Sequence, residues 1–493
     1  MRAPQEIMQM IQKYLKKYQS LQAPVKASLW FLICGFAQKG IAMFTIPIFA
    51  RIMTEAEYGR FSVYHSWFTI VEIIIGLDIA GSAFTRGLIK NEHHQDRFSS
   101  SMMGLSTTCI VLWTIVYFLF RNQICDLLDL SHFLTVAMIM EVWTHSAYLF
   151  WANKERANFR YKKLVLLTVM YVVLRPLFGI CFVLWSDVQT QVEGRVVSIV
   201  LVNALLFVPL YVSIMRKGRQ FFSKEYWLYA LKFTIPLLPH CLSHVLLSQT
   251  DRLMINVYCG AEYTAYYSIA YTLATVLQIL NQAVVVSLNP WMYRKINNGE
   301  YGKIGKISYG FLALMVLANL SVVIMAPELM AIIAPASYQV AVWVIPPVMT
   351  SVFFMSLYSL FVIFEYYFEK THYVTLATMI AAVLNVVLNA LLIPRFGFVA
   401  AGYTTMVCYA MCALAHYCFM RKIARSFMNG AVVYNTKIIL ALTGVLLGAS
   451  GVTMLLYEQT ILRYGLFLVL MVVIFSNRKT FLQVAKSIKK KED

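Results

Sequence analysis

Five ionisable side chains lie inside apolar stretches in the first half of this 493-residue sequence. On scales of membrane insertion, a charge at the centre of an apolar helix costs about 2.5–3.5 kcal/mol, so each such position requires a physical reason. An oppositely charged partner, water or a ligand can supply it. The five residues are Lys39, Glu72, Asp78, Glu141 and Arg175.

The chemistry that this set offers is ionic. The three acids can bind a proton or a coupling cation, and the two bases can hold an anion through charge-assisted hydrogen bonds. All except Asp78 fall near the middle of their stretches, and Asp78 lies one and a half turns after Glu72, so we expect a hydrated cavity. The alternative is that these charges form ion pairs between helices and only set their packing.

The second half of the sequence holds a pair of prolines followed by a pair of histidines. Pro236 and Pro239 remove backbone donors, which predicts a kinked or broken helix, and therefore a hinge, just before the histidines. His240 and His244 are spaced to share one helix face, where they could sense protons or bind sugars. Ordinary hydrogen bonding between helices is the alternative reading.

Asn385 and Asn389 have the same spacing, so their carboxamides also share one face. Carboxamides inside a membrane can bond across helices or to a glycan. Packing between helices is again the alternative.

Motifs that mark enzymes are missing from the sequence. It has no P-loop, no glycine-rich dinucleotide turn, no HExxH and no nucleophile elbow. Its nine cysteines lie mostly in apolar stretches, without CxxC spacing. We therefore expect no catalytic residues, no cofactor, no metal site and no step driven by ATP.

The elements that must position these residues are membrane-spanning helices. Hydrophobic residues make up 60% of the chain and charged residues only 13%, far from the composition of soluble domains. Apolar runs of the length that crosses a bilayer recur along the chain. We predict an all-α polytopic membrane protein with about fourteen spans, near 27–50, 61–85, 99–120, 131–152, 164–185, 195–215, 228–256, 263–291, 307–327, 338–364, 373–394, 398–420, 438–456 and 460–476.

The net charge of +19 would suggest nucleic acid as a partner if the cations were spread over a soluble surface. With the N-terminus in the cytoplasm, however, the inner segments hold 33 Lys or Arg residues and the outer segments seven. This distribution obeys the positive-inside rule. We therefore predict both termini in the cytoplasm and no binding of nucleic acid.

A weak internal repeat organises the chain. The segment AEYGRFSVY at 56–64 is echoed by AEYTAYYSI at 261–269, an offset of 205 residues. Six spans per copy predict a parallel repeat with a cavity between two lobes, as in alternating-access transporters. The predicted parts are a basic amphipathic N-terminal segment 1–26, a first lobe 27–220, a second lobe 221–425, two additional spans in 426–476 and a basic tail 477–493.

Several segments of the second lobe resemble the Wzx-type polysaccharide flippases of the MATE-like superfamily of multidrug, oligosaccharidyl-lipid and polysaccharide exporters. They are the paired prolines, the adjacent Asp251 and Arg252, the Gly-Ala-Glu turn at 260–262, and the series Asn385, Asn389, Pro394 and Gly397. The likeness extends from about residue 23 to the last span. Where the family often has Gly-Ala-Ala after the Asn-rich span, this chain has Val399, Ala400, Ala401 and Gly402.

The resemblance implies an ion-coupled flippase that moves a polyprenyl-diphosphate-linked oligosaccharide across a bacterial inner membrane for surface polysaccharides such as O-antigen or capsule. The coupling ion would be H+ or Na+, and other polysaccharide-assembly membrane proteins would be partners beside lipid. Lys39 and Arg175 would then face the diphosphate, with the histidine and asparagine pairs as further candidates for substrate binding. Glu72, Asp78 and Glu141 would couple the ion, and Pro236, Pro239, Asp251 and Arg252 are candidates for gating or structural roles.

Three other functions stay open at this stage. A drug or cation antiporter and a flippase for the peptidoglycan lipid precursor would share the architecture. A membrane-embedded polysaccharide polymerase or ligase would handle the same lipid-linked sugars, but such enzymes generally carry one long periplasmic loop, and the predicted outer loops here are short.

Overall fold

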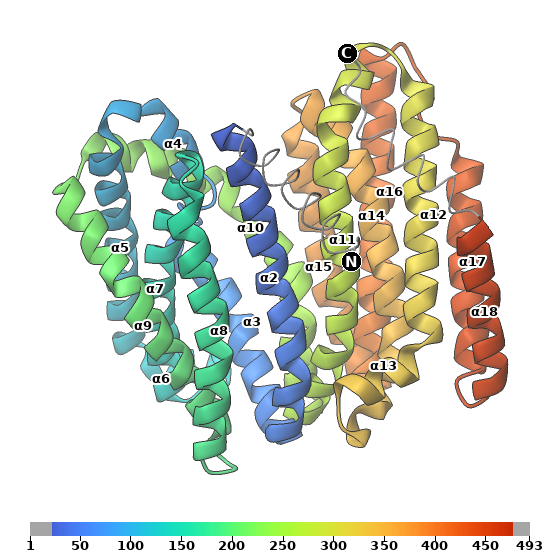
Figure 1. The fold of residues 1–493 in the computed structure, drawn as a ribbon, viewed down its shortest axis with the longest axis horizontal. Helices are drawn as coiled ribbons and strands as arrows, with labels where there is room; N and C mark the ends of the chain where they lie inside the picture. Colours follow the sequence, from blue (N-terminus) through green and yellow to red (C-terminus); the bar gives the residue numbers. More distant parts are fainter. Residues whose placement is uncertain (1–21, 477–493) are drawn as a thin grey trace, which may run out of the picture. The chain divides into compact units, whose positions relative to one another are not determined.

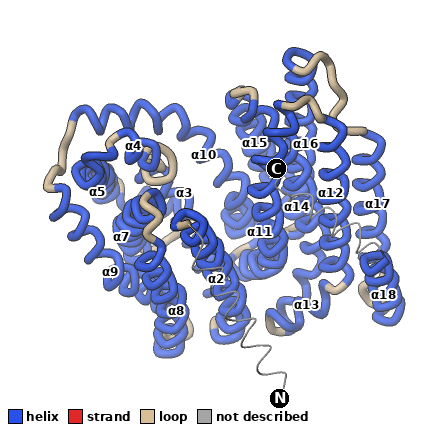
Figure 2. The backbone as a smooth tube through the Cα atoms, turned by 45° about the horizontal axis from the view of Figure 1, so that its top comes forward, coloured by secondary structure: helices blue, strands red, loops and turns tan. Residues whose placement is uncertain are grey.

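The computed structural model describes residues 22–476, and over this range the chain consists of helices joined by short loops, without a β-strand (Figure 2). Twelve of the described helices are long and apolar enough to cross a membrane. This confirms the all-α polytopic class. The predicted count of fourteen is not confirmed, because the helix at 55–76 is not among the twelve and the last helix has only 17 residues. The predicted N-terminal segment and basic tail lie mostly or wholly outside the described residues.

The described residues form two compact units whose boundaries fall inside helices α3 (Glu55–Gly76) and α10 (Lys224–Cys259). Unit 1 contains residues up to Ile52 together with Trp67–Leu238. It includes the end of α3 and the start of α10. Its other helices are α2 (Ala23–Ile52), α4 (Phe84–Lys90), η1 (Glu92–His94), α5 (Gln95–Leu119), α6 (Arg121–Leu128), α7 (His132–Ala157), α8 (Tyr161–Trp185) and α9 (Gln191–Gly218).

Unit 2 contains Met53–Ser66 and the chain from Pro239 onward. Beyond α10 its helices are α11 (Ala261–Asn297), α12 (Tyr301–Ile324), α13 (Ala326–Ile333), η2 (Ala336–Val344), α14 (Ile345–Tyr367), α15 (Thr371–Phe396), α16 (Val399–Phe427), α17 (Thr436–Leu455) and α18 (Thr460–Ser476).

The core of unit 1 is aromatic where the short helix α4 meets its neighbours. The ring of Phe84 stacks on Phe98 of α5 and meets Phe150 of α7 edge-on, with centroids 5.8 and 4.8 Å apart. All three side chains are buried. Trp227, at the start of α10, donates from Nε1 to the carbonyl oxygen of Ser101 at 3.0 Å, so the first turns of α10 are attached to the same core.

Helix α14 is the centre of unit 2. In the span that contains α14, 78% of an apolar stretch of 18 residues is buried, against 22% of such a stretch in α17. Helix α14 is therefore an inner helix and α17 an outer one. Within this unit α14 packs against α11, α12 and α16 (Figure 1). A helix that is apolar on all sides is expected in such a place, because no face of it meets water.

The second predicted span does not continue as one helix. The span 61–85 ends as helix at Gly76, and residues 77–83 form turns before α4 begins. Leu77 and Asp78 adopt left-handed backbone conformations, with φ of 50° and 48°. Asp78 therefore lies in a break between two helices and not on a helix face as predicted.

A charged turn connects α11 to α12. The carboxylate of Glu300 accepts a hydrogen bond from Lys295 Nζ at 3.1 Å and also pairs with Lys303. Hydrogen bonds from Lys303 and Lys295 lower the pKa of Glu300 to about 2. The turn therefore stays ionised at any physiological pH.

Candidate functional site

In unit 1 the midplane charges of the sequence come together as pairs. Glu72, near the end of α3, makes a short hydrogen bond through Oε1 with Nδ1 of His145 on α7. Both side chains keep partial exposure, 24% for Glu72 and 22% for His145. A carboxylate and an imidazole in contact can share a proton.

The second pair joins α7 to α8. Arg175 donates from one guanidinium nitrogen to Glu141 Oε1 at 3.2 Å and from another to the hydroxyl of Tyr171 at 2.5 Å. Glu141 is only 2% exposed, whereas Arg175 is 30% exposed. The buried acid therefore fixes the guanidinium, while part of the cation stays accessible to an anion.

Helix α2 also reaches this region. Gln38 donates from Nε2 to the hydroxyl of Tyr148 at 3.4 Å, and the Tyr148 ring stacks near His145 with centroids 5.9 Å apart. Lys39 follows Gln38 in α2, but its side chain lies outside the described part of the structure. Its role as a cation for the substrate stays a prediction.

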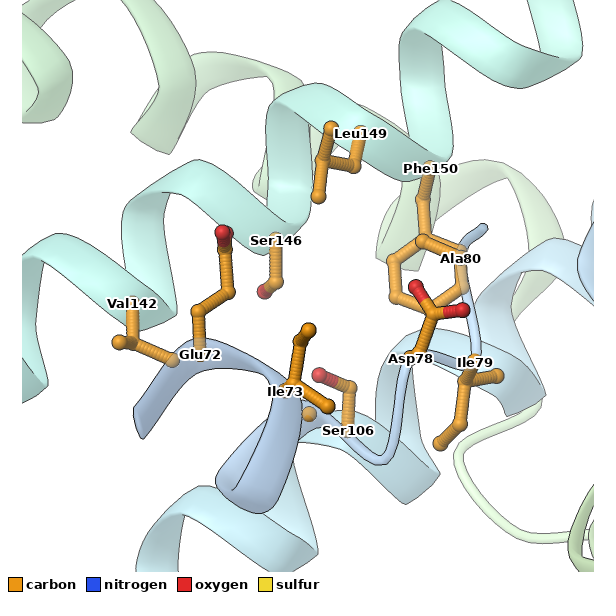
Figure 3. A pocket seen from close by; sticks show the side chains of 11 residues that line it. Glu72, Ile73, Asp78, Ile79, Ala80, Ser106, Val142, Ser146, Leu149 and Phe150 are labelled. Atoms are coloured by element: carbon orange, nitrogen blue, oxygen red, sulfur yellow. The ribbon is translucent and has the colours of Figure 1, made fainter. Parts of the chain in front are cut away.

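A small cavity of about 70 Å³ lies at the break after α3 (Figure 3). The carboxyl groups of Glu72 and Asp78 line it from α3 and the turn, and Ser146 of α7 lines it from the opposite wall. Ser106 of α5 adds a buried hydroxyl for which the structure shows no hydrogen-bond partner. Broken helices are where membrane transporters often place ion or substrate groups, because the freed backbone and side chains can line a polar space.

These contacts support both readings of the sequence. Glu141 and Arg175 form the ion pair between helices that the packing alternative predicts. At the same time Glu72, Asp78 and Arg175 keep access to a cavity or to the surface, so they can exchange a proton or meet an anion. The assignment of these acids to ion coupling and of Arg175 to an anion stays a prediction.

In unit 2 the carboxylate of Asp251 is the centre of a buried polar cluster. Asn385 and Asn389 of α15 donate to Asp251 Oδ1 at 3.1 and 2.8 Å. Tyr267 of α11 and Thr405 of α16 donate to Oδ2, each at 2.5 Å. Asp251 is 1% exposed, so these donors compensate the loss of water around its charge.

The same cluster contains oxygen atoms of the kind that a cation binds, although in this structure N–H and O–H groups donate to the Asp251 carboxylate. A carboxylate, two carboxamides and hydroxyl groups provide oxygen atoms, which hard cations such as Na+ prefer. Thr404 extends the network by donating to Asn389 Oδ1. Within the described residues no group of three or more His, Cys, Asp or Glu side chains is placed to hold a metal ion, so any cation here would depend on amide and hydroxyl oxygens.

Arg252 does not pair with its neighbour Asp251. Its guanidinium donates to the carbonyl oxygen of Ser248 at 2.9 Å and lies over the Tyr271 ring, 4.6 Å from the centroid. It also lies 5.9 Å from the ring centroid of Tyr267, whose hydroxyl bonds Asp251, and the candidate gating role of the two residues stays a prediction.

Helix α10 continues through both prolines, so it is not broken at Pro236 or Pro239. Pro239 nevertheless begins the second segment of unit 2, and its carbonyl oxygen accepts a hydrogen bond from the Ser243 hydroxyl at 2.7 Å. His240 bonds through Nδ1 to the Thr378 hydroxyl of α15 at 3.1 Å, and His244 is exposed. Their assignment to substrate binding stays a prediction.

Two groups were missed by sequence reasoning. His145 is four residues after Glu141, so the i, i+4 spacing was a signal that both face the same side of one helix. Glu365 was placed in a cytoplasmic loop, but it lies in the last turns of α14, fully buried against His416 of α16. No sequence signal links these two residues, because they meet only through the packing of α14 on α16.

Comparison with known proteins identifies the family of the chain. A model of the family described as polysaccharide biosynthesis protein matches residues 25–295, more than half of the sequence. The chain belongs to this family. The family predicted from the motifs is thereby confirmed. No curated protein sequence matches the chain significantly.

Solved structures of low sequence identity share the fold. The lipid II flippase MurJ in an inward closed conformation matches with a TM-score of 0.68 at 12% identity, over 92% of this chain and 99% of that chain. An inward-facing multidrug resistance MATE family transporter of the MOP superfamily matches with 0.58 at 12% identity, over 80% and 99%. The MATE transporter VcmN of Vibrio cholerae, in its bent form, matches with 0.52 at 14% identity, over 84% and 100%.

Proposed function

We propose that this protein flips a polyprenyl-diphosphate-linked oligosaccharide from the inner to the outer leaflet of a bacterial cytoplasmic membrane by alternating access. Membership of the polysaccharide biosynthesis family carries the proposal, because building a polysaccharide outside the membrane from units made inside requires such a step. The fold shared with a lipid II flippase and with MATE transporters supports movement of a substrate across the membrane over an enzymatic role.

Arg175 is the group that we assign to the anionic headgroup. A diphosphate is a bidentate acceptor, and a planar guanidinium matches it better than an ammonium does. Glu141 and Tyr171 hold the guanidinium in place, and 30% of the Arg175 side chain is exposed, where a headgroup could reach it. Lys39 would add a second cation.

Two groups are candidates for the coupling ion. The Glu72–His145 pair, beside Asp78, suits a proton, because a carboxylate and an imidazole in contact can share one and Glu72 also lines a small cavity. The buried oxygen cluster around Asp251 suits Na+. Imposed gradients of each ion across proteoliposomes would separate the two, because Glu72→Gln should remove only proton coupling and Asp251→Asn only Na+ coupling.

Deletion of the gene tests the substrate. Loss of a flippase should trap its lipid-linked glycan in the inner leaflet, where mass spectrometry of extracted polyprenyl lipids identifies it. The same extracted lipid, reconstituted with the purified protein, should move between leaflets at a rate that Arg175→Ala reduces at least about tenfold, which corresponds to loss of roughly one charge-assisted hydrogen bond.

Each alternative gives a different result in this experiment. Accumulation of the peptidoglycan precursor would identify that lipid as the substrate. Raised drug sensitivity with normal lipids would indicate an antiporter. Unpolymerised repeat units exposed on the outer face would indicate a polymerase or ligase, and any of these three would overturn the proposal.

A further inference from the structure

A second acid–imidazole pair lies in the core of unit 2, far along the chain from the groups used above. Glu365, two residues before the end of α14, contacts His416 of α16, with 2.7 Å between Oε1 and Nδ1. Both side chains are 0% exposed. In contrast to the Glu72–His145 pair, this pair has no access to water in the packed structure.

The outer atoms of the pair are unsatisfied. Among the residues that the structure describes, neither Oε2 of Glu365 nor Nε2 of His416 has a hydrogen-bond partner. The Tyr358 ring stacks on His416 with centroids 5.5 Å apart, which covers one face of the imidazole. The titratable groups that face the pair come from four helices: His240 of α10, Tyr358 and Tyr366 of α14, His372 of α15 and Cys412 of α16.

The charge state of the pair follows from its burial. With one ionisable proton between them, an imidazolium and a carboxylate, or their neutral forms, carry no net charge. Without that proton the pair leaves a single negative charge in a low-dielectric core, which costs several kcal/mol unless water or a cation reaches it. None of these facing groups is a lysine or an arginine, so none supplies a permanent positive charge.

We propose that Glu365 and His416 form a proton-binding site at the contact between α14 and α16. The closed packing of the two helices keeps the proton bound. Its release requires water to enter, and therefore requires α14 and α16 to separate around these residues. Proton occupancy is thus tied to the packing of the central helix of unit 2, at a site distinct from the partly exposed acids of unit 1.

Hydrogen exchange of the full-length protein in lipid nanodiscs tests this linkage without any transport substrate. If each local opening releases one proton, the opening constant of segments around 360–367 and 412–420 should rise about tenfold per pH unit. This holds between the pKa of the opened pair and that of the packed pair, after correction for intrinsic exchange. Glu365→Gln and His416→Gln should each abolish this slope. The matched control Glu369→Gln changes an exposed carboxylate four residues away and should retain it.

Infrared titration of the same samples provides a second readout. A carboxyl or imidazole band that titrates in the wild type should disappear in both core variants and persist in the control. If neither variant folds, the wild-type exchange slope still decides: a slope of zero in these segments overturns the proposal. A slope that survives in Glu365→Gln and His416→Gln also overturns it, and in both cases the proposed flippase function stands, because neither measurement involves lipid-linked glycan.

Discussion

At the residue scale, the contact between Arg175 and Glu141 leaves two roles for the guanidinium, stability of the fold and binding of the headgroup. Arg175→Ala removes the positive charge opposite a carboxylate that is 2% exposed, so we expect a loss of about 3–5 kcal/mol in stability. Combining it with Glu141→Gln removes both charges and should restore most of that stability. Thermal unfolding in detergent measures both effects.

The double variant also separates the two roles of Arg175. If the guanidinium binds the diphosphate, flipping in proteoliposomes stays lost although the protein is stable again. Recovered flipping in the Arg175→Ala, Glu141→Gln protein would show that the pair serves folding alone, and the assignment of Arg175 to the headgroup would fall.

The residue types and their positions within the apolar spans were enough to find the charged groups but not their partners. Glu72, Glu141 and Arg175 were identified because apolar surroundings make charges costly, a property of composition along one helix. Their partners depend on how helices pack, which is why His145 and the Glu365–His416 pair were missed. Asn385 and Asn389 were found from their spacing, yet their common acceptor Asp251 is more than 130 residues earlier in the chain.

At the element scale, the two echoing segments of the repeat pack directly on each other within unit 2. A Cβ atom added to Gly59 of α3 would lie 1.7 Å from the carbonyl oxygen of Ala261, the first residue of α11. Only glycine permits this approach of two backbones. Gly59→Ala should therefore separate the start of α3 from α11 and cost at least about 1–3 kcal/mol.

Gly448→Ala in α17 is the control for that substitution. No atom lies within 4 Å of the added Cβ there, so the change should be neutral or stabilise slightly through helix propensity. Melting temperatures of the two variants check the pair of expectations. Equal stability of Gly59→Ala and the wild type would mean that α3 and α11 do not meet as closely as described.

Helix existence was easier to predict than helix continuity. Each of the fourteen predicted spans overlaps a helix, since long apolar runs dictate helical backbone in a membrane. The break after Gly76 escaped prediction because its apolar residues continue into the turn, and only Asp78 and the glycines at 76 and 81 hinted at it. In α10 the two prolines predicted a kink or a break, and the helix continues without a break.

At the scale of the whole molecule, segments predicted on the same side of the membrane meet at the same end of their unit. In unit 1, Lys154 after the fourth span bonds Asp96 before the third at 2.6 Å, and both were predicted inside. In unit 2, Tyr367 and Asn297, also predicted inside, are joined at 3.4 Å. Ser337 and Glu55, both predicted outside, bond at 2.6 Å. These contacts agree with helices that alternate in direction, as the distribution of Lys and Arg over the loops requires. Only that distribution indicates which end of each unit faces the cytoplasm.

That orientation is the last prediction. With 33 of the Lys and Arg residues in the segments assigned inside, the positive-inside rule places those segments and both termini in the cytoplasm. Alkaline phosphatase fused after Lys163 or Lys224 should be inactive, and fused after Gln123 or Asp187 it should be active. A green fluorescent protein at the C-terminus should fluoresce, because that reporter folds in the cytoplasm. Active phosphatase at Lys163 together with an inactive fusion at Asp187 would invert the protein, and Arg175 would then have to be reached by a substrate arriving from the opposite leaflet.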